Sequence, residues 1–594
     1  MPVPRVLVLG LDGVGPELFE QLAGEGEMLP NLTSLRVRGA YGPLRSTTPP
    51  TTLPAWTSFM TGAAPSSHGV PDFTVREGYR VRFVGGGLRR LPTLFRHLED
   101  QGLTAGAAWF PATYPPEPLR GYQVSGWDSP VTARGDPSFV HPAELHDQLR
   151  RRFGGDHLDF DVIDEFSGDS DWYDRTALAL PARVRRRAEM AEWLLRSRPV
   201  DVAAFYFGEA DTAAHHFWAF HDPASPRRPR EVAPHLADAL RLVYQAIDDA
   251  VGLLVRAVGP RTSVVVLSDH GSGGASDVAI HINRVLERAG LLRFREAGRR
   301  GRLTGGVATR LRGAVPALIP AGLRRSVFRF AGGLAPSLVE SRLRFGGIDW
   351  DRTLAFSEEL TYAPSVWLNL RGREPRGQVS PREAARVAAE VEQAALDLRE
   401  ADVEASSGGG EEIREKSLKV GSGEGTFFRK FPPRERLVAR VIRRDEIHAG
   451  PFAHLFPDLV LELGSVAGYR PVCLPSRGCP GEVVTKLSGA DLLGRKGRSL
   501  PGCHSPDGVL FVAGDGVPAG LGIRARLEDV APVVAALAGV PGAPWFEGTP
   551  PRGLPAGPVG PAGSAAHDRR VPASYTQSEE RAVAERLRLL GYLE

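Results

Sequence analysis

Carboxylate and imidazole side chains follow three strongly apolar runs of this sequence, and these side chains can bind metal ions. Asp12 comes directly after the first run. Asp211 and His215 follow the second run, and their spacing of four residues places them on one face of a helix. Asp269 and His270 follow the third run, where successive side chains point in opposite directions and can serve neighbouring positions. Each run therefore delivers at least one potential metal ligand.

His504, just before a further apolar run, completes a set of three carboxylates and three imidazoles. Oxygen and nitrogen ligands without thiolate suit Zn²⁺ or Mn²⁺, and six of them suit two ions better than one. Each residue also has a structural interpretation, because an Asp after a strand often caps a turn and a His near an apolar run is often a core residue. His216 is an alternative to His215. The repetition at several strand ends favours a site for two divalent ions.

A hydroxyl-rich stretch with several prolines, residues 47–72, leads into an apolar segment that has the pattern of a helix start. A hydroxyl at a helix N-terminus, where backbone N–H groups and the helix dipole favour an anion, is well placed to attack a phosphate. We predict that Thr52 is this nucleophile. Thr48 and Thr51 are close alternatives, and a helix cap is the structural interpretation of the cluster.

The segments that must position these residues alternate between strand-like and helix-like patterns. The predicted strands are residues 5–11, 103–110, 200–207, 262–267, 365–370, 458–463 and 508–513. The predicted helices are residues 88–102, 182–196, 231–258, 380–399 and 529–538. This alternation predicts an α/β fold, a three-layer α/β/α sandwich with a mainly parallel central sheet, whose carboxyl edge is where such folds build their sites.

The overall charge does not call for nucleic acid or a membrane as a partner, because 24% of the 594 residues are charged and the formal net charge is +3. Segment 291–345 is an exception, with twelve Arg and no Lys against two acids. It could form an amphipathic cap, an interfacial helix pair or a solvated or packed insertion. We favour the insertion, with peripheral contact to an anionic membrane as the alternative.

The three cysteines, Cys473, Cys479 and Cys503, are too few and too irregularly spaced for a disulfide framework or a thiolate zinc site. We expect reduced thiols. The N-terminus enters a strand-like run at Arg5 without the features of a signal peptide, and there is no run of about 18 apolar residues. We therefore expect a cytoplasmic protein.

The catalytic core is expected to be discontinuous in sequence. The Arg-rich segment would interrupt it, and a Pro/Gly-rich linker would separate it from a C-terminal helix whose stripe of Val583, Leu587 and Leu590 should dock elsewhere. The expected parts are residues 1–290 and 346–547 for the core, 291–345 for the insertion, 548–575 for the linker and 576–594 for the docking helix.

The motifs occur in a distinctive order along the chain. Up to residue 270 they are GLDGV, TTPPTTLPAWTSFMTG, AAPSSHGV, YFGEADTAAHH and VVVLSDHG, and later ones are WLNLRGREPRGQV, FPDLVLEL, GCHSPDGVLFVAGDG and RLEDVAPVVAALAGVPGAP. This order resembles the type I phosphodiesterase and nucleotide pyrophosphatase family of the alkaline phosphatase superfamily. The resemblance implies an alkaline phosphatase-like fold and covers most of the chain apart from residues 111–180, 291–345 and 404–426.

The resemblance also implies roles for the candidate residues. Thr52 would be the nucleophile, forming a phospho-threonine intermediate that water then hydrolyses. Two divalent ions, Zn²⁺ or Mn²⁺, would activate the hydroxyl and clamp the attacking and leaving oxygens. One ion would be held by Asp211, His215 and His504, and the other by Asp12, Asp269 and His270 together with Thr52.

One position departs from the family pattern. Nucleotide pyrophosphatases usually carry Asn three residues after the nucleophile, where it helps to bind a phosphate oxygen, whereas this chain has Ala55 followed by Trp56. The phosphate pocket must therefore differ, which puts nucleotide diesters in question. The stretch also lacks the Cys/Ser-x-Pro-x-Arg sequence of sulfatases, which argues against that branch.

These observations predict a metal-dependent hydrolase of phosphoric esters, with diesters or pyrophosphates preferred and a small-molecule or lipid phosphate ester as substrate. A phosphomonoesterase or phosphotransferase of the same superfamily is the alternative among enzymes. A protein of another class, which binds an anionic surface through the basic segment without catalysis, is the further alternative. The presence of all six candidate ligands and the hydroxyl favours the enzyme.

Overall fold

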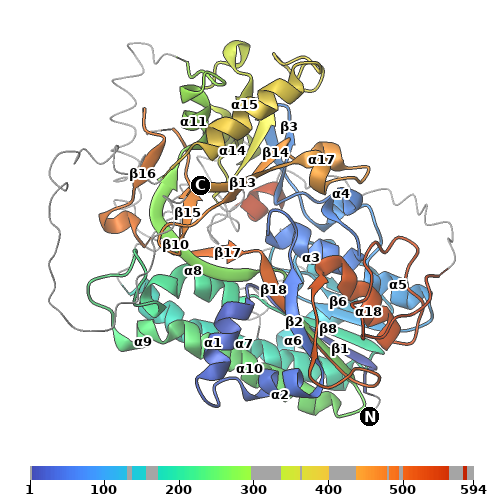
Figure 1. Cartoon of the computed structure of the whole chain (residues 1–594). Coiled ribbons are helices and arrows are strands. Elements are labelled where there is room, and N and C mark those ends of the chain that lie inside the picture. The colour runs from blue at the N-terminus through green and yellow to red at the C-terminus, as the bar shows by residue number, and fades with distance from the viewer. Residues whose placement is uncertain are drawn as a thin grey trace.

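The chain folds into an α/β unit, which fills the lower half of Figure 1, and a smaller second unit above it. The computed structural model describes residues 3–129, 137–154, 171–295, 336–361, 364–399, 436–477, 481–493, 500–560 and 579–584.

The central sheet of the larger unit is parallel through its middle. Its strand order is β19-β2-β18-β9-β1-β8-β5-β6-β7, with β20 paired to β2. The parallel strands at its centre are β9 (Ser263–Leu267), β1 (Val6–Leu11), β8 (Val202–Phe207), β5 (Ala105–Ala108) and β6 (Tyr122–Val124). At the edges lie β19 (Leu521–Gly522), β20 (Ala525–Arg526), β2 (Ala40–Arg45), β18 (Asp507–Ala513), which runs antiparallel to β9, and β7 (Val140–His141).

Strand β1 lies between β8 and β9, and this order brings the candidate ligands together. Every residue of β1, β8 and β9 is buried, as expected for parallel strands covered on both faces. Asp12 leaves the carboxyl end of β1, while the segments with Asp211 and Asp269 leave the same ends of its two neighbours. Three acids that are far apart in the sequence therefore meet at one edge.

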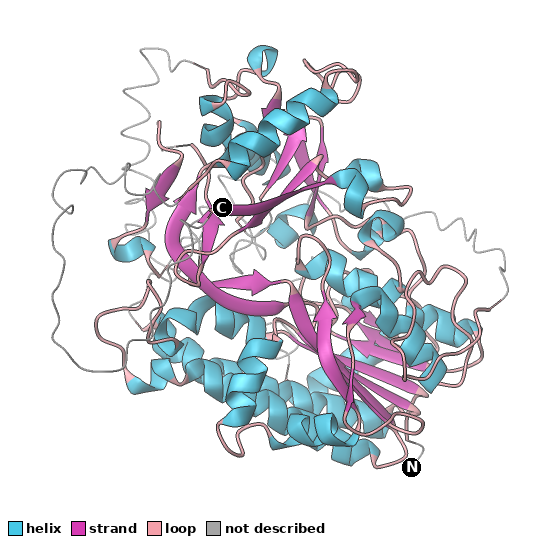
Figure 2. Cartoon of the chain, in the orientation of Figure 1, coloured by secondary structure: helices cyan, strands magenta, loops and turns pink. Residues whose placement is uncertain are grey.

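Helices cover both faces of this sheet, so the predicted three-layer architecture is confirmed (Figures 1 and 2). One layer contains α1 (Pro16–Gly24), α2 (Pro30–Arg38), α6 (Ala143–Phe153), α7 (Trp172–Ser197), α8 (Glu209–His221), α9 (Pro234–Ala237) and α10 (Ala239–Val258). The other contains α3 (Thr52–Thr61), α4 (Pro65–His68), α5 (Leu94–Asp100) and α18 (Val530–Leu537).

The second unit has its own antiparallel sheet and its own apolar core. The sheet order is β11 (Ala355–Phe356), β12 (Ser365–Leu368), β14 (Leu459–Leu463) and β13 (Val438–Arg443). Its core also includes residues of α11 (Ile282–Arg288), α14 (Pro336–Phe345) and α15 (Ala384–Leu396), and α17 (Arg444–Ile447) follows β13. The hairpin β3 (Thr74–Glu77) and β4 (Arg80–Phe83) reaches this unit from the larger one, since Val81 belongs to its core.

Strand β10 (Gly271–Ile280) runs from the larger unit toward the second one as a long curved ribbon (Figure 1). Its first half pairs with β17 (Gly502–Ser505), which carries His504, and its second half pairs with β15 (Arg470–Cys473) and β16 (Val484–Lys486). The Gly- and Ser-rich sequence of β10 gave no strand signal, because its extended form depends on partners distant in the chain.

Residues 346–547, expected as the second part of the core, contribute to both units. Strands β11 to β14 form the sheet of the second unit, and β18 to β20 join the central sheet. The segment 291–345 contributes α14, where Arg344 forms ion pairs with Glu340 and Glu358, while residues 296–335 of it lie outside the described residues.

The C-terminal prediction is described in part. Val583 is buried in the core of the larger unit, whereas Leu587, Leu590 and most of the linker lie outside the described residues. Cys473 and Cys503 are buried free thiols, and Cys479 is not described.

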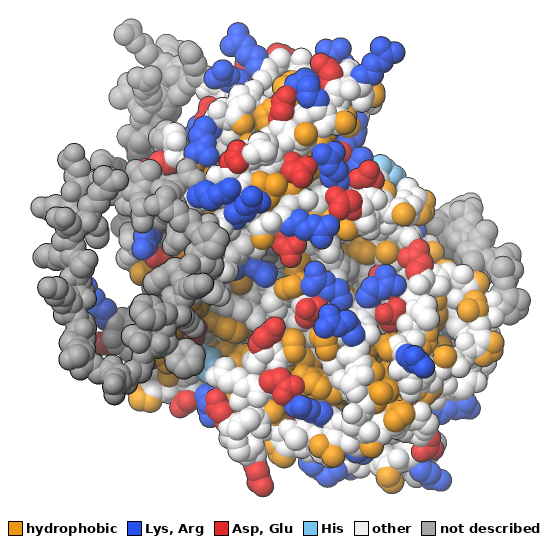
Figure 3. Space-filling model, in the orientation of Figure 1, with side chains coloured by type: hydrophobic (Ala, Val, Ile, Leu, Met, Phe, Trp, Pro, Cys, Tyr) orange, Lys and Arg blue, Asp and Glu red, His pale blue; other side chains and the backbone are white. Residues whose placement is uncertain are grey.

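In the described part of the chain, no helix combines the length and apolar character needed to cross a membrane. The visible face in Figure 3 carries basic and acidic side chains intermixed over both units.

Candidate metal centre and nucleophile

The six candidate ligands form one buried group, which we name the acid–histidine cluster: Asp12, Asp211, His215, Asp269, His270 and His504. Its members come from the ends of β1 and β9, the first two turns of α8 and strand β17. Each is at most 6% exposed. The structure thus brings together every metal ligand that the sequence predicted.

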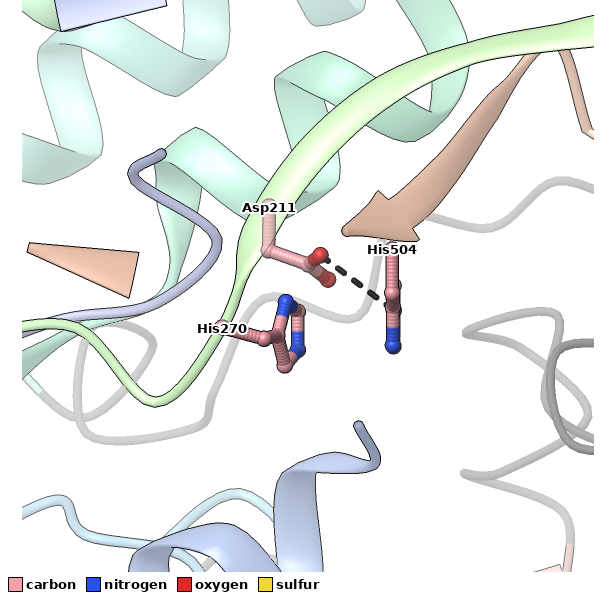
Figure 4. A group of neighbouring side chains, drawn as sticks. All are labelled: Asp211, His270 and His504. Atoms are coloured by element: carbon pink, nitrogen blue, oxygen red, sulfur yellow. Dashed lines mark ion pairs between the residues drawn. The ribbon is translucent and has the colours of Figure 1, made fainter. Parts of the chain in front are cut away.

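One half of the cluster is centred on His504. Asp211 Oδ1 lies 3.4 Å from His215 Nε2 and 3.6 Å from His504 Nε2. The Nε2 atoms of His215 and His504 are only 3.0 Å apart. Figure 4 shows Asp211, His270 and His504 converging, and the rings of His270 and His504 stack with centroids 3.8 Å apart.

The other half contains the two carboxylates that follow β1 and β9. His270 Nε2 lies 3.5 Å from Asp12 Oδ1 and 3.2 Å from Asp269 Oδ2. The backbone N–H of Gly13 donates to Asp269 Oδ1 at 3.3 Å, and Gly13 has a φ of 74°, which allows this sharp turn after β1. Facing ligand atoms of Asp12, Asp269 and His270 lie within 4.8 Å of one another, and so do those of Asp211, His270 and His504.

The three imidazoles are oriented by backbone carbonyls. Because a carbonyl only accepts hydrogen bonds, each Nδ1 must carry the proton and each Nε2 must present its lone pair to the cluster. Two such lone pairs 3.0 Å apart, on His215 and His504, repel each other unless a cation lies beside them. The carbonyl partners are Gly502 for His215 at 3.1 Å, Gly271 for His270 at 3.0 Å and Pro50 for His504 at 2.8 Å.

The electrostatics of the cluster also fit a cation. Burial lowers the pKa of His215 to about 3 and lowers the pKa values of His270 and His504, so these imidazoles stay neutral. Burial and the charge of Asp12 raise the pKa of Asp269 well above its usual value. No hydrogen-bond donor among the described residues reaches Asp12 Oδ1 or Asp269 Oδ2. Crowded carboxylates with neutral imidazoles match the ligand set of a divalent ion.

Thr52 lies at the edge of the cluster. It is the first residue of α3, is 1% exposed and places Oγ1 3.5 Å from His270 Nε2. Thr51 is the residue before the helix, with extended backbone angles, and its hydroxyl has no hydrogen-bond partner among the described residues. His216, the alternative imidazole on α8, packs against Trp172 with the ring planes tilted by 60° and the ring centroids 4.9 Å apart.

Two aromatic residues that the sequence did not single out as site residues touch the cluster. Trp56 Nε1–H donates to Asp12 Oδ2 at 3.1 Å, and the Tyr206 hydroxyl donates to the same oxygen at 2.6 Å. Their residue types were the sequence signal that could have pointed to such a contact, because a buried Trp or Tyr usually finds a partner for its polar atom.

A cleft opens beside His504, between the loop that precedes α3 and the second unit. Pro49 and Pro50 line one side, Ile442 and Leu461 the other, and Arg470 also reaches it. The guanidinium of Arg470 donates to the backbone carbonyl of His504 at 2.5 Å. The two units therefore share the space next to the cluster.

No curated protein matches this chain. Among solved structures, phosphonoacetate hydrolase from Sinorhizobium meliloti 1021 is 14% identical, with 89% of this chain and 94% of that chain covered and a TM-score of 0.48. Murine ectonucleotide pyrophosphatase/phosphodiesterase 5 is 11% identical, with 90% and 95% covered and a TM-score of 0.44.

The type I phosphodiesterase/nucleotide pyrophosphatase family model matches residues 6–420, which is more than half of the chain and includes every cluster residue except His504. The protein therefore belongs to this family of hydrolases, as the order of its sequence motifs predicted.

Proposed function

We propose that this protein hydrolyses phosphodiester or pyrophosphate bonds through a phospho-threonine intermediate on Thr52, with two divalent ions, Zn²⁺ or Mn²⁺, as cofactors. The observation that carries the proposal is the convergence of six buried ligands and one hydroxyl at a single edge of the sheet. Burying three acids beside neutral imidazoles costs folding free energy unless a bound cation compensates their charge.

The ligand sets follow from the two halves of the cluster. Asp12, Asp269 and His270 would hold one ion and Asp211, His215 and His504 the other, with His270 close to both. Bound ions would lower the pKa of the attacking hydroxyl and neutralise charge on the phosphoryl oxygens.

The residues of the chain then have definite tasks. Thr52 Oγ attacks phosphorus, the Oγ–P bond forms, and the bond from phosphorus to the leaving oxygen breaks, with the hydroxyl proton passing to solvent. Water next attacks phosphorus, the Oγ–P bond breaks, and Thr52 regains its proton. The N-terminus of α3 would favour the anion through the helix dipole and the backbone N–H groups of Thr52 and Leu53, because Pro54 has no N–H and that of Ala55 donates to the Thr51 carbonyl.

A phosphomonoesterase or phosphotransferase is the second candidate, and Ala55 keeps it open. This residue is fully buried and apolar at the position where the family usually carries an asparagine donor. The phosphate pocket therefore lacks one donor that nucleotide pyrophosphatases usually have, which puts nucleotide diesters in question as substrates. The surface-binding alternative has no comparable support among the described residues, since Arg344 of the basic segment is paired with acids.

The test is turnover of bis-p-nitrophenyl phosphate and p-nitrophenyl phosphate by purified protein loaded with Zn²⁺ or Mn²⁺. Faster turnover of the diester supports the proposal, and turnover of the monoester alone replaces it with the second candidate. Thr52→Ala should lower turnover by about 10⁴-fold or more while metal content is retained.

Thr51→Ala is the matched control, because it removes the adjacent hydroxyl from the same turn. Turnover that survives in Thr52→Ala but disappears in Thr51→Ala would identify Thr51 as the nucleophile. Turnover that survives in both variants would contradict a threonine nucleophile at this helix.

A further inference from the structure

Asp12 Oδ2 accepts hydrogen bonds from two aromatic side chains, and its other oxygen faces the cluster. Trp56 Nε1–H donates at 3.1 Å and the Tyr206 hydroxyl at 2.6 Å, while Asp12 Oδ1 lies 3.5 Å from His270 Nε2. No described residue donates a hydrogen bond to Oδ1, although Asp12 is only 1% exposed. The carboxylate is thus oriented with one oxygen occupied and one directed to the candidate metal position.

A third aromatic residue fixes the orientation of the tyrosine. Trp127 Nε1–H donates to the Tyr206 oxygen at 3.2 Å, so this oxygen accepts one hydrogen bond while its own proton goes to Asp12. The rings of Trp56 and Tyr206 also meet edge to face, with centroids 5.3 Å apart. Neither ring can turn freely without breaking a buried hydrogen bond.

Two glycines provide the space for these rings. A Cβ on Gly10 would lie 2.7 Å from the Trp56 ring, and a Cβ on Gly208 would lie 2.7 Å from the Tyr206 hydroxyl. Neither glycine has a positive φ, so close approach explains their use better than backbone conformation does. Strand β1 and the end of β8 are therefore shaped around the two donors.

Trp56 also connects Asp12 to the candidate nucleophile. Thr52 and Trp56 are four residues apart in α3, so both side chains lie on the same face of one helix. Thr52 Oγ1 contacts His270 Nε2 at 3.5 Å, and Trp56 contacts Asp12. The indole hydrogen bond therefore holds the start of α3 at a fixed distance from the ligands.

We propose that Trp56 and Tyr206 are positioning residues that hold Asp12 as a one-oxygen ligand of a divalent ion and keep the Thr52 helix in register with that ion. The proposal rests on the two-metal function proposed above. Hydrogen bonds of this kind to a ligating carboxylate typically change metal affinity by about 10- to 100-fold. The loss should be confined to the ion held by Asp12, Asp269 and His270.

The experiment measures Zn²⁺ binding to the purified full-length chain by equilibrium dialysis, with no substrate present. Tyr206→Phe and Trp56→Phe keep an aromatic ring and delete the donor. Each should lower the affinity for one of the two ions by about 10- to 100-fold and leave the affinity for the other unchanged. Tyr122→Phe is the matched control, because this phenol is fully buried in the same sheet and its hydroxyl has no hydrogen-bond partner in the described residues.

Thermal unfolding of the metal-free variants separates positioning from a general structural role. Tyr206→Phe should unfold within a few degrees of Tyr122→Phe, although only the former loses an ion. Full binding of both ions by Tyr206→Phe and Trp56→Phe would overturn the proposal, and so would an equal loss of both ions together with a large loss of stability. A wild-type protein that binds no ion would overturn the two-metal function itself.

Discussion

Two regions of this molecule bury carboxylates, and they compensate the charge by different means. Where the β3–β4 hairpin meets the second unit, each acid has a guanidinium partner. Arg76 forms an ion pair of 2.6 Å with Glu374, and Arg373 contacts Glu374 at 2.8 Å and Asp458 at 2.6 Å. We name these four residues the arginine junction. Arg76 also stacks on Trp367, at 3.9 Å from the ring centroid.

The acid–histidine cluster has no equivalent compensation for two of its acids. Among the described residues, the ion pairs of Asp12 and Asp269 are with His270, whose pKa is lowered by burial. A neutral imidazole does not balance a carboxylate. The junction therefore carries its counter-charges within the chain, whereas in the proposed metal site a bound cation would supply them.

The comparison separates buried charges that stabilise the fold from buried charges that are proposed to bind a ligand. The arginine junction should stabilise the protein with or without metal. The cluster should cost stability without metal and contribute it with metal. The following predictions test that contrast, beginning with the largest expected effect.

Glu374→Gln should lower the free energy of unfolding by about 3–5 kcal/mol, because it leaves the buried Arg76 guanidinium without its charge partner. The side chain of Glu374 is 0% exposed and that of Arg76 is 5% exposed. Urea unfolding should give the same loss with and without Zn²⁺. Glu390→Gln, which breaks an exposed pair with Arg386, is the control and should change stability by about 0.5 kcal/mol or less.

Removal of metal by a chelator should lower the stability of the wild-type protein by about 2.7 kcal/mol for each ion lost, relative to free Zn²⁺ at 100 times the dissociation constant of that ion. The reason is that the ion binds the folded cluster and not the unfolded chain. Urea unfolding at the two metal levels measures the difference, and Glu374→Gln should show it undiminished. Equal stability at both levels would contradict the assignment of the cluster as a metal site.

His68 separates the acid sensitivity of the fold from that of the cluster. It lies outside the cluster, its Nε2 is 3.1 Å from Ser58 Oγ, and burial lowers its pKa to about 3. Between pH 6.5 and 3 the unfolded chain binds a proton at this residue and the folded chain does not. Stability therefore falls as pH falls through this window.

The slope should be about 1.4 kcal/mol per pH unit for this one residue. His68→Gln should remove that contribution from the pH dependence of urea unfolding, and metal loading should not restore it. A variant that retains the full wild-type slope would show that His68 titrates normally in the folded protein.

Asp269→Asn should raise the stability of the metal-free protein, although it removes a predicted ligand. Burial and the charge of Asp12 raise the pKa of Asp269, so its ionised form is unfavourable in the folded state. The folded protein therefore loses stability as pH rises and this carboxylate ionises. At pH 8 the variant should therefore unfold at higher urea than metal-free wild type. A loss of stability would place this carboxylate with the acids of the arginine junction.

The sequence by itself singled out the candidate ligands that the structure brings together. Asp12, Asp211 and Asp269 could be found because each follows a strand whose apolar character is strong and local, so its identity as a strand needs no distant partner. The start of the helix at Thr52 was also predicted, from hydroxyl and proline residues that act within one turn. Local signals of this kind do not depend on contacts with distant segments of the chain.

Only the tertiary structure decided how these residues meet. His504 joins the cluster because β17 pairs with β10, and β10 is a Gly- and Ser-rich segment that is extended only through strands far away in the sequence. The separate second unit and the contacts of Trp56 and Tyr206 with Asp12 have the same origin. Hydrogen bonds and pairings between distant segments depend on relative positions that no local pattern of residues encodes.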